Sequence, residues 1–192
     1  MAATMTNFYS MKFLDNKSGV WAVSNEKSVF LALYEDVENC KELKQMAVDG
    51  KIDGILINPA MIIHPFQVLM AARKATHNMS VNKMTTKKFQ TEVLYSLSAN
   101  KNITDSLIKF GITDQQRSIL LAVMSSPDTV AEDGEKLGQV IQGRKTDLSS
   151  IGKYTDEKLI KKVYKVKDPE LEVGLLLDAV IGRIASKDFV SF

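Results

Sequence analysis

The sequence predicts an α/β fold: a single layered domain over residues 1–192, with a mixed sheet of about four to five strands, helices packed on it and a helical C-terminal third. Short apolar, β-branched runs alternate with helical stretches, which is typical of layered α/β domains. The first two expected strands follow one another without a helix between them, which favours a mixed sheet over a purely parallel one. A length of 192 residues with 45% hydrophobic residues fits one domain.

Five runs have the β-branched, aromatic or uniformly apolar character of strands. They are residues 11–14, 28–34, 54–57, 91–97 and 118–124. The polar segment 15–27, which contains Trp21, lies between the first two runs and is expected to form a loop or a wide hairpin. Asn58-Pro59 stops the third run, because a residue before proline favours a turn or an extended conformation.

Six stretches have the patterns of helices. They are residues 40–48, 65–79, 103–110, 131–142, 155–165 and 169–186. Asn39 can cap the first helix, and Gly50 supplies the left-handed residue that ends it. Pro65 opens the second helix, where its missing N–H costs nothing. Residues 125–136, with Pro, Gly and four acids, are expected to form the most mobile loop, and residues 1–10 to be flexible.

Composition excludes several classes of protein. Lys and Arg number 25 against 23 Asp and Glu, so the net charge of +2 excludes a globally basic nucleic-acid coat and leaves room for a local patch. Cys40 is the single cysteine, which excludes an internal disulfide and a cysteine metal cage and fits a reducing compartment. No apolar run approaches the roughly 18 residues of a membrane span, and the first ten residues lack a secretory signal. A soluble, intracellular protein is expected.

The sequence contains no recognisable catalytic constellation. Glycine-rich phosphate loops and the G-x-S-x-G elbow are both missing. His64 and His77 stand outside any metal-ligand motif, so neither a metal nor another cofactor is expected. His64 precedes Pro65 and is expected to cap the helix rather than to act in catalysis. Cys40, in the first turn of its helix, can form a thiolate, but a small buried residue is the favoured interpretation. We expect a protein that is not an enzyme.

Two acid-free basic runs are the first feature that indicates binding. They hold Arg73, Lys74, Lys83, Lys87 and Lys88 in residues 73–88, and Lys158, Lys161, Lys162, Lys165 and Lys167 in residues 158–167. Such runs attract phosphate backbones, and Tyr164 is available to stack on a base. The alternative is that each run is the solvated side of an amphipathic element.

Surplus apolar surface on two helices is the second such feature. A helical wheel from Pro65 puts a stripe with Phe66 and Met70 apart from the core face, and the final helix is apolar on more than one side. The residues that this pattern assigns to a partner are Phe66, Met70, Leu171, Leu175, Val180 and Ile184. The alternative is that the helices are fully buried.

Four segments carry a family resemblance. They are IDGILINPAMIIHPFQVLMAARKATH (52–77), NKMTTKKFQTEVLYSLS (82–98), NITDSLIKFGI (102–112) and KKVYKV (161–166). In order and spacing, over about residues 28–187, the chain resembles the TPRKB family of PRPK-binding proteins. The most specific part is I-D-G-x-L-I-N-P followed by P-F-Q.

The resemblance implies a non-catalytic accessory subunit of the KEOPS/EKC complex, which makes threonylcarbamoyladenosine in tRNA. It implies that the six partner-facing residues above bind PRPK, a small atypical kinase, and that the protein is cytoplasmic and nuclear. It also implies contact with the 3′ CCA end of tRNA. The residues expected at tRNA are Arg73, Lys74, Lys83, Lys87, Lys88, Lys161, Lys162, Tyr164 and Lys165. Two alternatives stay open: a self-standing RNA-binding module, and a small enzyme using Cys40 or a histidine.

Overall fold

The computed structural model of the chain describes residues 19–24 and 26–190. The predicted strand 11–14 and the predicted flexible residues 1–10 lie outside this range. The strands are β1 (Val20–Ala22), β2 (Ser28–Glu35), β3 (Ile55–Ile57), β4 (Ile119–Ser125) and β5 (Arg144–Thr146). The helices are α2 (Cys40–Asp49), α3 (Pro65–Ser80), α4 (Phe89–Leu97), α5 (Ile103–Phe110), α6 (Val130–Gly138), α7 (Glu157–Tyr164), α8 (Asp168–Val173) and α9 (Leu176–Ser186), with 3-10 turns η1 (Pro59–Met61) and η2 (Leu148–Lys153).

The sheet is built around β2. Its strand order is β1-β2-β4-β3, and β5 pairs with the end of β2 beyond β1. The α/β class and the number of strands are confirmed, but the expected mixed pairing is wrong, because every pairing between the described strands is antiparallel. The reason is that β4 lies between β2 and β3. These two strands are therefore parallel to one another without being neighbours.

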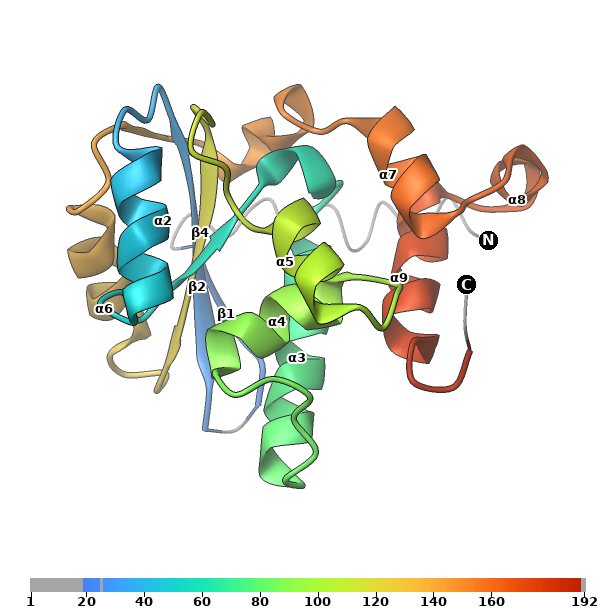
Figure 1. The fold of residues 1–192 in the computed structure, drawn as a ribbon, viewed down its shortest axis with the longest axis horizontal. Coiled ribbons are helices and arrows are strands. Elements are labelled where there is room, and N and C mark those ends of the chain that lie inside the picture. The colour runs from blue at the N-terminus through green and yellow to red at the C-terminus, as the bar shows by residue number, and fades with distance from the viewer. Residues whose placement is uncertain (1–18, 25, 191–192) are drawn as a thin grey trace.

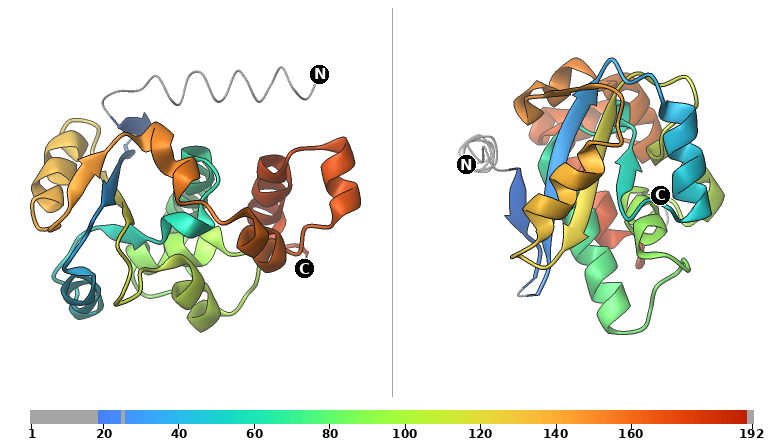
Figure 2. Two further views of the ribbon diagram at one scale, coloured as in Figure 1. Left: turned by 90° about the horizontal axis from the view of Figure 1, so that it is seen from above. Right: turned by 90° about the vertical axis from the view of Figure 1, so that its left-hand side faces the viewer.

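Helices cover both faces of the sheet and produce two hydrophobic cores (Figures 1 and 2). Helices α2 and α6 cover one face, where Phe30, Ala32 and Tyr34 of β2 point. On the other face, Leu31 and Leu33 pack in the larger core that α3, α4, α7 and α9 share. Because alternate residues of β2 enter different cores, the strand is apolar throughout rather than alternating.

Most local predictions are confirmed. Residues 15–27 contain the hairpin strand β1, which pairs with residues 28–30 of β2. Gly50 ends α2 with φ 75°, in the left-handed region. His64 caps α3, since its Nδ1 accepts a hydrogen bond from the backbone N–H of Phe66 at 3.2 Å.

Four expectations about elements are wrong. Residues 91–97, expected as a strand, belong to helix α4, because contacts with α3 and β3 bury an apolar run that has strand-like composition. The expected helix 169–186 is broken at Gly174 into α8 and α9. The expected loop 125–136 contains most of α6, and the expected helix 131–142 ends at Gly138.

Helix α6 lies close to β2 because its glycines leave room for aromatic rings. Gly134 and Gly138 are one turn apart and both are buried. A Cβ atom added at Gly134 would lie 2.2 Å from Cδ1 of Phe30, and one at Gly138 would lie 2.2 Å from the Tyr34 hydroxyl oxygen. The close approach of this helix to the sheet therefore requires residues without a side chain.

We expect Gly134→Ala to lower the free energy of unfolding by about 1–3 kcal/mol, because the new methyl group overlaps the buried Phe30 ring. Gly182→Ala in α9 is the matched control, since no atom lies within 4 Å of its added Cβ. The control should be neutral or stabilising, by up to about 1 kcal/mol. Urea unfolding of both variants tests this, and equal stabilities would contradict the packing argument.

Candidate interaction surfaces

Cys40 and His64, the two residues that the sequence offers for chemistry, both serve the fold. Cys40 is buried, and burial raises the pKa of its thiol, which disfavours the thiolate. Burial lowers the pKa of His64, whose Nδ1 is used to cap α3. No group of three or more His, Cys, Asp or Glu side chains in the described residues is arranged to hold a metal ion. Within the same residues, no helix is long and apolar enough to cross a membrane.

The two basic runs lie in different parts of the molecule. The first follows the end of α3 and the loop 81–88 at the lower end of Figure 1, whereas the second follows α7 at the upper right. The fold therefore does not join them into one continuous surface. Each run borders its own cavity.

A buried carboxylate holds the loop 81–88 in place. Glu92 of α4 is fully buried and accepts hydrogen bonds from the backbone N–H groups of Thr85 and Thr86 at 3.0 and 2.8 Å. It also accepts from the Thr86 hydroxyl at 2.9 Å and from the Asn78 amide at 3.1 Å. Four donors satisfy this buried charge, which fixes the shape of a loop that is otherwise exposed.

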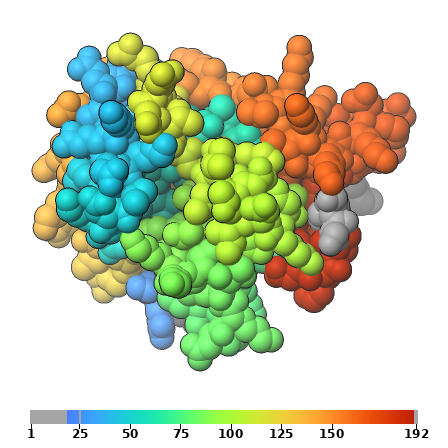
Figure 3. All heavy atoms as spheres, viewed as in Figure 1, coloured from blue at the N-terminus to red at the C-terminus, as the bar shows by residue number. Residues whose placement is uncertain are grey.

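The first cavity, called here the α4 cleft, has a volume of about 740 Å³. It lies between α2, α4, α5 and the loop 81–88, and Figure 3 shows α2 in cyan beside α4 and α5 in green on this face. Its described lining residues are Lys44, Ala47, Val48, Gly50, Ile52, Asp53, Gly54, Ile55, Leu56, Thr85, Thr86, Lys87, Lys88, Gln90, Thr91, Leu94, Ile103, Leu107, Gly111 and Ile112. The walls are mainly aliphatic, and three lysines accompany one aspartate.

The second cavity, called here the α7 pocket, has a volume of about 300 Å³. It lies between α7, the loop that precedes α5 and the last turn of α5, and its lining residues are Ala99, Asn100, Lys109, Leu159, Lys162, Val163 and Lys165. Lys165 ends α7 with φ 54°, a left-handed conformation that is strained for residues other than glycine.

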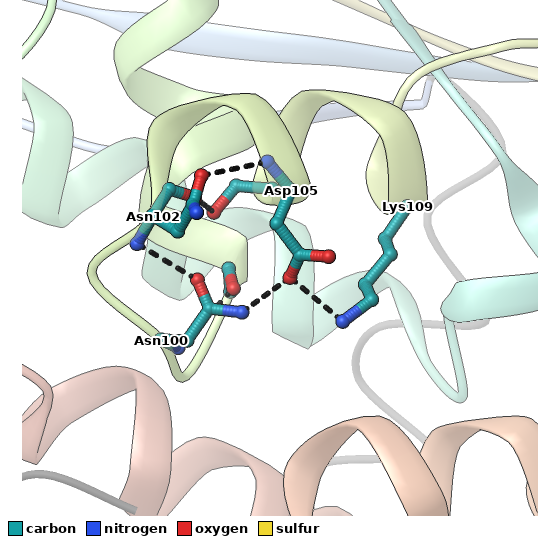
Figure 4. Close-up of polar contacts among 6 residues, drawn as sticks. Asn100, Asn102, Asp105 and Lys109 are labelled. Carbon is teal, nitrogen blue, oxygen red and sulfur yellow. Dashed lines mark hydrogen bonds and ion pairs between the residues drawn. The ribbon is translucent and has the colours of Figure 1, made fainter.

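A hydrogen-bond network orders the wall of the α7 pocket formed by α5 (Figure 4). The Asn102 side chain caps α5 by accepting from the backbone N–H of Asp105 at 3.0 Å, while the Asn100 side-chain oxygen accepts from the backbone N–H of Asn102 at 3.0 Å. The Asp105 carboxylate accepts from Asn100 at 2.5 Å and from the Lys109 ammonium at 2.7 Å. The hydrogen bond from Lys109 lowers the pKa of Asp105.

Lys74, expected at tRNA, instead links α3 to the end of α9. Its side chain is 14% exposed and donates to the carbonyl oxygen of Ile184 at 2.9 Å and pairs with Asp188 at 2.9 Å. Beside it, the buried Lys187 ammonium donates to the carbonyl of Tyr95 and lies 3.1 Å from the centre of that ring. Burial and the neighbouring Lys74 lower the pKa of Lys187 to about 7. The RNA contact at Lys74 stays a prediction, for a side chain that is mostly buried and already paired.

Tyr164, expected to stack on a base, is fully buried. Its hydroxyl donates to the carbonyl oxygen of Leu97 at 2.5 Å and accepts from the Gln67 amide at 3.0 Å. Its ring packs edge-on against Phe110, with the ring centres 5.9 Å apart. The expectation is wrong because the sequence pattern of α7 left open which way this aromatic ring points.

Two of the six residues expected at a kinase are core residues. Val180 and Ile184 are fully buried, so neither is available to a partner. Phe66, Met70 and Leu171 are half-buried against the same core, and Leu175 is 39% exposed.

The break in the expected helix 169–186 exposes an apolar residue that the sequence pattern did not single out. Val173, at the end of α8, is 85% exposed. The break at Gly174 turns α8 away from α9 and leaves Val173 and Leu175 on either side of the junction. The sequence itself contains an indication of this break, because a glycine such as Gly174 within an apolar helical pattern weakens the case for a continuous helix.

Comparisons with known proteins agree on one family. A family model described as "Kinase binding protein CGI-121" matches residues 34–188. The EKC/KEOPS complex subunit TPRKB of Danio rerio is 36% identical over 164 residues, covering 85% of this chain and 93% of that protein. The subunit cgi121 of Schizosaccharomyces pombe is 28% identical over 168 residues, covering 85% and 95%. That of Aspergillus fumigatus is 32% identical over 144 residues, covering 72% and 76%.

We expect Tyr164→Phe to lower the free energy of unfolding by about 1–3 kcal/mol, because it leaves the Leu97 carbonyl and the Gln67 amide buried without this partner. RNA binding at a temperature where the variant is folded should match that of the original chain. Urea unfolding and an RNA titration measure the two quantities. Weaker RNA binding with unchanged stability would show that the Tyr164 hydroxyl group reaches RNA after all.

Proposed function

Because the chain belongs to the CGI-121 family of kinase binding proteins, we propose that it is a non-catalytic accessory subunit of the KEOPS/EKC complex that binds and supports the kinase PRPK. The family resemblance read from four sequence segments is confirmed by the match over residues 34–188. That match is the observation that carries the proposal, together with three relatives whose names describe subunits of this complex. The proposal includes a role in recruiting tRNA for threonylcarbamoyladenosine modification.

The environment of the chemically reactive residues supports a non-catalytic role. The Cys40 thiol is buried with a raised pKa, and the His64 Nδ1 is engaged in capping a helix. The raised pKa keeps the Cys40 thiol out of its nucleophilic form, and the cap uses the lone pair of the His64 Nδ1 that a general base would need.

For the kinase we propose the junction between α8 and α9, which stands at the edge of the molecule, far from the sheet (Figure 1). An ion pair fixes this junction: the Arg183 guanidinium of α9 lies 2.9 and 2.8 Å from the two carboxylate oxygens of Glu170 in α8. The hydrogen bond from the backbone of Lys167, followed by that from Arg183, lowers the pKa of Glu170. The fixed junction presents Val173 and Leu175 to a partner, and apolar groups held exposed in this way are typical of interaction surfaces.

We expect Val173→Asp to weaken binding of the purified kinase at least about tenfold, since burying a valine side chain contributes roughly 1.5–3 kcal/mol and aspartate adds a desolvation cost. Val48→Asp is the matched control, because Val48 is also highly exposed but lies on α2, across the sheet. Calorimetric titration measures the affinities, and the melting temperatures of both variants should stay near that of the original chain. An equal loss of kinase affinity in both variants, or no loss in either, would contradict the proposal that the kinase binds this surface.

For tRNA we propose the α7 pocket. Lys162 and Lys165 add positive charge to a cavity where the Asp105 carboxylate already pairs with Lys109. Such a site attracts the phosphates of a single strand such as the CCA end, and the aliphatic wall of Leu159 and Val163 can contact the bases. With Tyr164 buried, no aromatic residue among those lining this pocket contributes stacking.

We expect Lys165→Gly combined with Lys162→Gln to weaken tRNA binding and to reduce the log–log salt slope by about 1.4, since each single-strand phosphate contact contributes about 0.7. Glycine suits the left-handed backbone at residue 165, so stability should be kept or raised. Lys158→Gln, on the same helix but outside the pocket, is the control and should change the slope little. Filter binding with intact and CCA-trimmed tRNA measures this. An unchanged slope in the double variant would rule out the pocket.

A further inference from the structure

The α4 cleft, which is larger than the α7 pocket, is used neither by the proposed kinase surface nor by the proposed tRNA site. Its floor and walls are aliphatic, with Ile52, Leu94 and Leu107 among the lining residues, and none of the described lining residues is aromatic. Aliphatic walls favour apolar side chains over nucleobases, because single-stranded nucleic acids bind by stacking on aromatic rings. The lining therefore points to a protein segment.

The charged residues at the rim of the cleft determine which charge its occupant should carry. Lys44, Lys87 and Lys88 line the cleft. Lys44 pairs with Asp114 at 2.8 Å and the Lys88 ammonium donates to the carbonyl oxygen of Val48 at 3.3 Å, whereas Lys87 is exposed on the loop that Glu92 anchors. The aspartate in the lining, Asp53, accepts a hydrogen bond from Gln90 at 2.5 Å. An acidic segment is complementary to this rim, and a basic segment would be repelled by it.

The edge strand β3, which borders the cleft, favours an occupant in an extended conformation. Strand β3 ends the strand order, and on its outer side the structure pairs Ile57 with Gly111. The preceding residues Ile55 and Leu56 line the cleft. An extended segment laid along this edge can therefore add to the sheet as a further strand, with alternate side chains pointing to opposite faces.

We propose that the α4 cleft docks an extended, acidic segment of a protein other than the kinase. Alternate apolar side chains of that segment pack against Ile52, Leu94 and Leu107, and the carboxylates between them meet Lys87 and Lys88. The loop 81–88 forms one wall of the groove, and the buried Glu92 holds that wall in shape before the segment binds.

The probe is a fluorescein-labelled octapeptide that alternates leucine with aspartate, titrated into the full chain and followed by polarisation. Two matched peptides serve as controls: one replaces every leucine by serine, and the other replaces every aspartate by lysine. The leucine–aspartate peptide should bind saturably and at least about tenfold more tightly than either control. Equal binding of the serine peptide, or no saturable binding, would overturn the proposal.

Three variants, of which one is a control, locate the binding of the peptide. Val48→Asp places a carboxylate at the exposed rim and should weaken the leucine–aspartate peptide about tenfold, whereas Val173→Asp, remote from the cleft, should leave it unchanged. Lys87→Glu should weaken the same peptide and strengthen the leucine–lysine peptide, an exchange of preference that loss of folding cannot produce. Melting temperatures confirm that each variant is folded.

The same variants also test whether the kinase or RNA, rather than an acidic protein segment, occupies the α4 cleft. Loss of kinase binding in Val48→Asp would assign the cleft to the kinase and overturn the proposal. Binding of a labelled octauridylate that depends on Val48 and Lys87, in place of the peptide, would assign the cleft to RNA and overturn it equally. Failure here leaves the proposed function intact, because that function is tested through Val173 and Lys165.

Discussion

The helical half of this protein depends on one buried hydroxyl group. The Tyr164 side chain at the end of α7 donates to the carbonyl of Leu97 at the end of α4 and accepts from Gln67 of α3. Gln67 in turn donates to the carbonyl of Met61 at 3.0 Å and accepts from the backbone N–H of Ile63 at 3.1 Å, so each polar atom has a partner. Burial raises the pKa of Tyr164 and keeps it the neutral donor that this network needs. The network joins three helices at one point in the core.

The shape of the surfaces proposed for partners depends on this junction, on one buried carboxylate and on one partly buried ion pair. Tyr164 fixes the end of α7, and with it one wall of the α7 pocket. Glu92 fixes the loop that walls the α4 cleft, and the Arg183–Glu170 pair fixes α8 against α9. In each case a group that is costly to bury is satisfied by hydrogen bonds, and an exposed segment gains one conformation. Preformed surfaces of this kind bind without a large ordering cost.

The arrangement separates the surfaces in space. The α8–α9 junction lies at the edge of the helical side, whereas the α4 cleft opens beside α2. The α7 pocket lies between the two, with α5 as the shared element: Ile103 and Leu107 face the cleft, and Lys109 faces the pocket. A subunit with this geometry can hold several partners at once, which suits an accessory role in an assembly.

The sequence by itself determined the α/β class, the caps at His64 and Gly50, most of the helices and the family. Those properties follow from local signals, since caps and periodicity act within one or two turns of the chain. The tertiary structure alone decided that residues 91–97 form a helix, that Tyr164, Val180 and Ile184 are core residues, and that the basic runs lie apart. The physical reason is that burial is set between distant segments: Tyr164 meets Leu97 across 67 residues, and no local pattern encodes which face of a helix such a contact will cover.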